Sequence, residues 1–172
     1  MCIRDSIAAM LIAFIAIIAL VDGILGQVGD LIGFSKWGSG LVPDILKADG
    51  AVRLNTTLIF GWIFSPMAWL LGIPWSEAPM AAALLGQKTT VNEFVAYLSL
   101  SQWTEFFSDR TTIIMSYALC GFANFSSIGI VVGGIGSLVP ERRSDLAKWG
   151  VYAMIAGTFA AFMTAMVAAI LI

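Results

Sequence analysis

The sequence lacks histidine altogether and contains only two cysteines among its 172 residues. Histidine is the commonest general base and metal ligand, so its absence removes the usual means of hydrolytic catalysis and of zinc binding. Cys2 and Cys120 are far apart, and Cys120 lies inside an apolar run, which argues against a disulfide framework or a cysteine-based metal site. No nucleophile–base pair is visible either. We therefore expect no enzymatic activity, no bound metal and no cofactor.

Charged residues are also scarce. They make up 12% of the chain, where a soluble domain carries roughly 25%. The net charge is −2, and no basic run is long enough to attract nucleic acid. By contrast, 59% of residues are hydrophobic and the mean hydropathy is +0.92. A soluble fold of this size could not bury so much apolar surface, so the sequence predicts an all-α protein embedded in a lipid bilayer.

Two segments are predicted to be transmembrane helices, residues 7–26 and residues 146–172. At 1.5 Å per residue, each is long enough to cross a hydrocarbon core of about 30 Å. The small residues of the second segment favour close helix packing. Residues 1–6 are interpreted as a non-native lead-in, in which case the reading frame is cut and the chain is a fragment.

The region after the first helix is polar and then becomes aromatic. Residues 27–53 are rich in glycine, aspartate and lysine and are predicted to form an extracytoplasmic loop. Residues 54–73 are apolar enough to span, but tryptophans at 62, 69 and 75 favour the headgroup level. We therefore predict an interfacial helix here, with a full span as the alternative.

Two further segments are interrupted. Residues 77–101 contain two apolar stretches separated by the polar run 86–90, and each stretch is too short to span. This pattern predicts a re-entrant hairpin with its turn at 86–90, because non-helical backbone at membrane depth must be buried in protein or line a wet cavity. A pair of amphipathic helices outside the membrane is the alternative. Residues 111–139 are predicted to form a discontinuous transmembrane helix, broken near Asn124.

Charge asymmetry predicts the sidedness of these segments. Arg142, Arg143 and Lys148 flank a short loop, which the positive-inside rule places in the cytoplasm. The C-terminus and the long loop then lie outside. The topology is self-consistent only if residues 54–73 do not cross and residues 77–101 re-enter, which supports both predictions.

Glu93 is the first candidate site residue. A carboxylate within a membrane segment costs roughly 2.5–3.5 kcal/mol on insertion scales and is a functional candidate by default. Its alternative role is a favourable interaction with the helix dipole at a wet hairpin tip. Other charged residues at segment ends are interpreted as solvated: Glu77, Glu105, Asp109 and Arg110.

A second polar group is expected in the broken helix. Asn124 and Ser127 are three residues apart, so they would share one face of a helix and could bind adjacent sugar hydroxyls. The alternative is a hydrogen bond between membrane helices, with no binding role. Phe122 and Phe125 flank the pair and could stack on a ring-shaped substrate or face lipid and core.

These motifs resemble a known family. Residues 86–97 (GQKTTVNEFVAY) and 118–130 (ALCGFANFSSIGI) are similar to the signature stretches of concentrative nucleoside transporters, and residues 133–136 and 142–147 continue the match. The resemblance extends over residues 7–172. It implies an elevator-type transporter in the plasma membrane, the inner membrane of a bacterium. Such a transporter is usually a homotrimer that moves nucleosides inward with a sodium or proton gradient.

The resemblance also implies roles for individual residues. Glu93, Asn124 and Ser127 would hold the ribose, Phe122 would lie close to the bound nucleoside, and residues 54–73 would be the extracellular interfacial helix. The match covers only the C-terminal half of family members, so the base-reading hairpin and the site of the coupling ion are expected outside this chain. We therefore expect no transport by the fragment alone. The alternative function is a non-transporting membrane binding or assembly subunit of the same fold.

Overall fold

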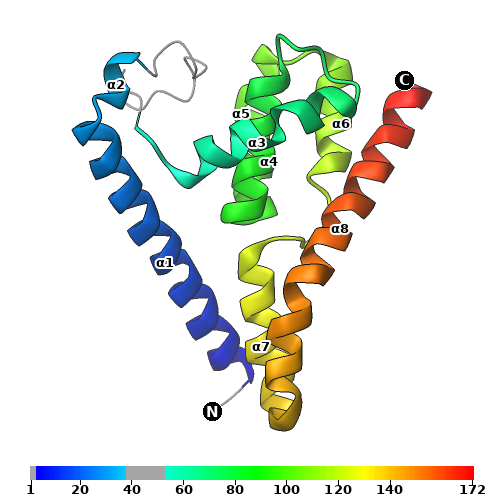
Figure 1. The fold of residues 1–172 in the computed structure, drawn as a ribbon. Coiled ribbons are helices and arrows are strands. Elements are labelled where there is room, and N and C mark those ends of the chain that lie inside the picture. Colours follow the sequence, from blue (N-terminus) through cyan, green and yellow to red (C-terminus); the bar gives the residue numbers. More distant parts are fainter. Residues whose placement is uncertain (1–2, 38–52) are drawn as a thin grey trace.

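The computed structural model describes residues 3–37 and 53–172, and the regular structure of these residues is all helical (Figure 1). The helices are α1 (Ile3–Leu31), α2 (Phe34–Trp37), α3 (Thr56–Leu70), α4 (Ala78–Thr90), α5 (Glu93–Trp103), α6 (Asp109–Ala118), α7 (Phe125–Leu138) and α8 (Arg143–Leu171), with 3-10 turns at Thr104–Phe106 and Pro140–Arg142. The predicted all-α class is therefore correct.

Two long helices frame the molecule. α1 and α8 each have 29 residues and diverge from the end at which the chain begins (Figure 1). α7 packs against both of them near that end. The N-terminal end of α1 and the turn between α7 and α8 share this end, while the C-terminus lies at the other. The order of these ends along the molecule is the one expected, whereas the crossing, interfacial and re-entrant segments and the cytoplasmic end stay predictions.

Helix length limits which elements could span a membrane. Within the described residues, the helical stretch Pro140–Leu171 is long and apolar enough to cross, whereas Thr56–Leu70 and Phe125–Leu138 are shorter apolar helices. At 1.5 Å per residue, the latter two reach only about 20 Å. A crossing that uses α7 therefore has to include α6 as well.

The first helix is longer than the sequence indicated at both ends. Residues 3–6, assigned to the lead-in, form its first turn, where Asp5 is favourably placed at the positive end of the helix dipole. At the other end, α1 continues to Leu31 into the segment predicted to be a loop. The loop prediction is wrong there because Gly29 is buried in a contact with Leu54 and does not break the helix. Residues 38–52 of the predicted loop lie outside the described residues.

The helix α3 lies across the first helix of the hairpin. It packs closely on α4 because glycines face the contact: a Cβ at Gly86 would lie 2.6 Å from the carbonyl oxygen of Thr57. Phe64 of α3 meets Phe162 of α8 edge to face, with ring centroids 6.3 Å apart. The main apolar core therefore lies where α3, α4, α5 and α6 meet the C-terminal half of α8.

The hairpin turn lies directly after the run in which it was expected. The polar run 86–90, predicted to be the turn, continues the helix α4 to Thr90. Its hydroxyls do not break the helix because Thr89 Oγ1 and Thr90 Oγ1 donate to the carbonyls of Leu85 and Gly86, one turn back.

The actual turn is at Val91 and Asn92. Asn92 has extended backbone angles and is the N-cap of α5, and its side chain accepts from the amide of Val95 at 2.9 Å. Asparagine is among the preferred N-cap residues, so this signal was available in the sequence.

The second interruption is where it was expected. α6 ends at Ala118 and α7 begins at Phe125, which leaves residues 119–124 as the break. Gly121 has a φ of +109°, a backbone conformation that favours glycine.

Two charged residues expected to be solvated have partners. The carboxylate of Glu77 accepts from the amide and the hydroxyl of Ser108, both at 3.2 Å. Arg110 Nη2 donates to the carbonyl of Ala169 in the last turn of α8, at 2.7 Å. The first two bonds join the residues that precede α4 and α6. The bond from Arg110 joins α6 to α8 and satisfies a carbonyl that a helix end leaves free.

Candidate functional site

The tip of the α4–α5 hairpin meets the break between α6 and α7. Glu93, the first residue of α5, is half-buried there, and Asn124, at the end of the break, is only 1% exposed. Asn124 Nδ2 donates to Glu93 Oε2 at 2.6 Å. The fold thus joins two candidate residues that are 31 positions apart in the sequence.

Asn124 is held by its other end as well. Its backbone is extended, and its Oδ1 caps α7 by accepting from the amide of Ser127 at 2.8 Å. The same oxygen accepts from Ser127 Oγ at 2.9 Å and from Ser126 Oγ at 2.6 Å. With Oδ1 bound to donors and Nδ2 bound to a carboxylate, the orientation of the amide is defined.

This geometry corrects one expectation. Asn124 and Ser127 were expected to share a face of one helix, but Asn124 precedes the helix and contacts Ser127 directly as its cap. Because the backbone of an N-cap residue is extended, its side chain does not follow the periodicity of the helix that begins after it. Ser126, which is buried and bonded to Asn124, was not singled out from the sequence.

Glu93 has a favourable position for a carboxylate. It begins α5 directly after the cap Asn92, where the positive end of the helix dipole stabilises negative charge. Within the described part of the chain, only Asn124 donates to its carboxylate, and does so at Oε2. The carboxylate is therefore both fixed in place and able to accept further hydrogen bonds.

An open pocket of about 330 Å³ lies beside the break, within the range of small-molecule sites. Phe122, Asn124 and Ser127 line it, together with small residues of α8 such as Gly150 and Gly157. Phe122 is 77% exposed. Glu93 is not part of the lining and contacts the pocket wall through Asn124.

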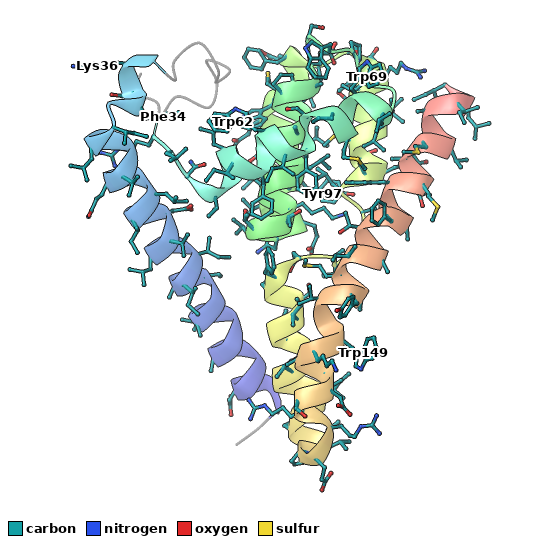
Figure 2. All side chains as sticks on the ribbon, in the orientation of Figure 1. Phe34, Lys36, Trp62, Trp69, Tyr97 and Trp149 are labelled. Carbon is teal, nitrogen blue, oxygen red and sulfur yellow. The ribbon has the colours of Figure 1, made fainter. Side chains whose placement is uncertain are left out.

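The structure adds a residue that the sequence reasoning placed in a turn. Lys88 of α4 is 1% exposed, and its Nζ donates to the carbonyl of Ala118 at 2.9 Å and to that of Cys120 at 3.5 Å. Tyr97 of α5, labelled in Figure 2, donates from its hydroxyl to the carbonyl of Ser116 at 2.6 Å. A single lysine between apolar stretches was the available signal, because such a charge needs buried partners.

Comparison with known proteins gives consistent matches along the chain. The family model described as "Na+ dependent nucleoside transporter C-terminus" matches residues 2–169. A Bacillus subtilis protein named "Uncharacterized transporter YutK" is 44% identical over 167 residues, which are 97% of this chain and 37% of that protein. "Sodium/nucleoside cotransporter 1" of Rattus norvegicus is 40% identical over 181 residues, covering 96% of this chain and 25% of that protein.

Solved structures of CNTnw match the fold. A variant in its intermediate 2 state has a TM-score of 0.81 at 40% identity, covering 99% of this chain and 39% of that one. CNTnw in an inward-facing substrate-bound state has a TM-score of 0.71 at 41% identity, covering 95% and 37%. The chain thus spans between 25% and 39% of the length of these relatives. It belongs to the Na+-dependent nucleoside transporter family of integral membrane proteins and corresponds to their C-terminal part.

Proposed function

We propose that this chain supplies the ribose-binding half of a carrier that takes up nucleosides with a sodium or proton gradient. One observation carries the proposal: the hydrogen bond between Glu93 and Asn124, which brings the hairpin tip to the helix break. The rat relative is named as a sodium/nucleoside cotransporter. The same substrate class and coupling ion are therefore the first to test here.

The chemistry of the pair suits a sugar. Vicinal hydroxyls both donate and accept, so a binding site needs acceptors and donors close together. The Glu93 carboxylate can accept, and the Asn124 amide has a second N–H beyond the one given to Glu93. The Ser127 hydroxyl donates its proton to Asn124 and can accept from a solute. A charge-assisted bond to the carboxylate would be the strongest of these.

The pocket offers an apolar surface beside these groups. Phe122 exposes its ring at the break and lines the same pocket as Asn124 and Ser127. An aromatic face next to hydrogen-bonding groups suits a nucleoside, which combines a planar base with a polar sugar. We propose that residues outside this chain complete the base and ion sites, in a homotrimer of the bacterial inner membrane.

Radiolabelled uridine and adenosine uptake tests the proposal. The gene at its full length is expressed in cells that lack nucleoside uptake, with and without a sodium gradient, as native protein and as Glu93→Ala. We expect Glu93→Ala to lower kcat/KM by about 10- to 100-fold, because hydrogen bonds to a charged group contribute about 1.5–3 kcal/mol. Glu105→Ala, an exposed carboxylate in a 3-10 turn, is the matched control and should leave uptake unchanged.

Two results would contradict the proposal. Uptake that is equally high in Glu93→Ala and native protein would remove the carboxylate from the site. Nucleoside binding by the native protein without uptake under any gradient would favour the non-transporting subunit instead.

A further inference from the structure

The buried lysine of the hairpin contacts the carboxyl-terminal end of α6, outside the polar groups assigned to the sugar. Lys88 Nζ donates to the carbonyls of Ala118 and Cys120, and its side chain is 1% exposed. Both carbonyls belong to the point where α6 gives way to the break. A helix end leaves its last carbonyls without partners inside the helix, and here the partners come from another element.

The carbonyls of this end are divided between two kinds of donor. The backbone amides of Leu119 and Cys120 donate to Met115 and Tyr117. Two other carbonyls accept from side chains of the hairpin: that of Ser116 accepts from the Tyr97 hydroxyl, and that of Ala118 accepts from the Lys88 amine. The hairpin therefore completes the hydrogen bonding of α6 across a sequence distance of 19 to 30 residues.

The same hairpin tip holds the other side of the break. Glu93 accepts from Asn124, the cap of α7. The amine of Lys88 thus lies at the negative end of one half-helix, and the carboxylate of Glu93 lies near the positive end of the next. Both placements are favourable with respect to the helix dipoles.

Packing holds the ends of the break, where Leu119 and Ala123 are buried, but contributes little at its middle. A Cβ at Gly121 would meet no heavy atom within 4 Å, and Phe122 is 77% exposed. Gly121 also has the conformational freedom of glycine at a positive φ. The conformation of Gly121 and Phe122 is therefore set from the two ends of the break, where the hydrogen bonds of Lys88 and Asn124 add to this packing.

We propose that Lys88 is a positioning residue, which clamps the end of α6 to the hairpin tip and so fixes residues 119–124 in the conformation that presents Phe122, Asn124 and Ser127 to the pocket. The choice of uridine as the substrate rests on the proposed function, whereas the role of Lys88 rests on its hydrogen bonds to the end of α6. Without the clamp, a solute would have to order the break when it binds, and its affinity would fall.

The first test is uptake kinetics of the gene at its full length. Lys88→Met keeps an unbranched apolar chain of similar length and removes the donor. We expect it to raise the KM for uridine at least about tenfold, the size of effect expected when buried acceptors lose their donor. Lys88→Arg restores a donor and should recover most of the native KM. Lys148→Met, at an exposed lysine of α8, is the matched control and should match native protein.

The second test does not depend on nucleosides. Hydrogen exchange of the purified protein should show faster exchange of amides 119–124 in Lys88→Met, with α3 and α8 unchanged. Tyr97→Phe, which removes only the bond to Ser116, should show a smaller increase in the same segment, and it serves if Lys88→Met does not fold.

The outcomes separate the two proposals. A native KM together with native exchange in Lys88→Met would overturn the clamp. Faster exchange spread evenly over all helices with an unchanged KM would also overturn it, because that result indicates a general stabilising role. If native protein neither binds nor takes up uridine or adenosine, the proposed function fails, while local exchange at 119–124 still decides the role of Lys88.

Discussion

Asn92 and Asn124 each begin a helix after an interruption, and their local geometry is nearly the same. Their backbones are extended, with φ and ψ of −170° and 169° at Asn92 and of −143° and 166° at Asn124. Each side-chain oxygen accepts from the amide three residues on, at 2.9 Å and 2.8 Å. Their surroundings differ: Asn92 is half-exposed, whereas Asn124 is buried and also bonds to Glu93, Ser126 and Ser127.

The difference shows where a capping residue becomes part of a site. A cap needs only an acceptor and an extended backbone, which the local sequence supplies. The amide nitrogen is not needed for the cap, and at Asn124 it binds the carboxylate of a different element. The comparison therefore predicts that substitutions at Asn92 change stability alone, whereas substitutions at Asn124 change stability and solute binding together.

The largest effect is expected for Asn124→Ala. It removes the cap, which contributes about 1 kcal/mol, and leaves a half-buried carboxylate without its donor, which costs about 1–3 kcal/mol more. We expect the unfolding free energy to fall by about 2–4 kcal/mol. Nucleoside uptake should be lost. Thermal unfolding in detergent and uridine uptake by the gene at its full length measure the two effects.

Asn124→Asp separates the cap from the bond to Glu93. An aspartate keeps an oxygen for the amide of Ser127, but when ionised it cannot donate to a second carboxylate and is repelled by it. We expect uptake to be lost as in the alanine variant. Native uptake by Asn124→Asp would show that the bond from Asn124 to Glu93 is dispensable, and the comparison would lose its basis.

The sequence was sufficient for one interruption and misleading for the other. The break near Asn124 was predicted from the polar residues within an apolar segment long enough to span and from the broken helices of transporters. In the hairpin, the run 86–90 has the composition of a turn, but Gly86 lies against α3 and Thr89 and Thr90 bond within their own helix. The composition of a segment indicates which local conformation it prefers, but it does not show which other helix will pack against the segment.

The role of Lys88 could not be predicted from the local sequence either, because it depends on a distant part of the chain. Its acceptors are backbone carbonyls 30 and 32 positions away, and every residue has such a carbonyl. The sequence pattern therefore contains no sign of which ones it would bind. The assignment of Glu93, Asn124 and Ser127 to a common site came from the family resemblance, and their role in binding stays a prediction.

An intermediate effect on stability is expected for Gly121→Ala in the α6–α7 break. Gly121 has a φ of +109°, whereas the hairpin turn uses Val91 at a φ of −100° and contains no glycine. Gly121→Ala should lower the unfolding free energy by about 1–3 kcal/mol through backbone strain. A steric clash does not contribute, because a Cβ at this position would meet no atom within 4 Å. Thermal unfolding measures the loss.

Gly23→Ala is the control for this substitution. Gly23 lies within α1, and a Cβ there also meets nothing within 4 Å. Alanine at a helical position should stabilise the protein by about 0.4–1 kcal/mol. Equal effects of the two substitutions would mean that the left-handed conformation of the break carries no strain for alanine.

The smallest effect is expected for Asn92→Ala. Only the bond to the amide of Val95 is lost, so the unfolding free energy should fall by about 1 kcal/mol. The KM for uridine should stay within about twofold of the native value, because a lost cap costs binding affinity only if the site moves with it. Thermal unfolding and uptake kinetics, run beside Asn124→Ala, measure both quantities. A KM raised as strongly at Asn92 as at Asn124 would mean that the start of a helix, and not the bond to the hairpin carboxylate, governs solute binding.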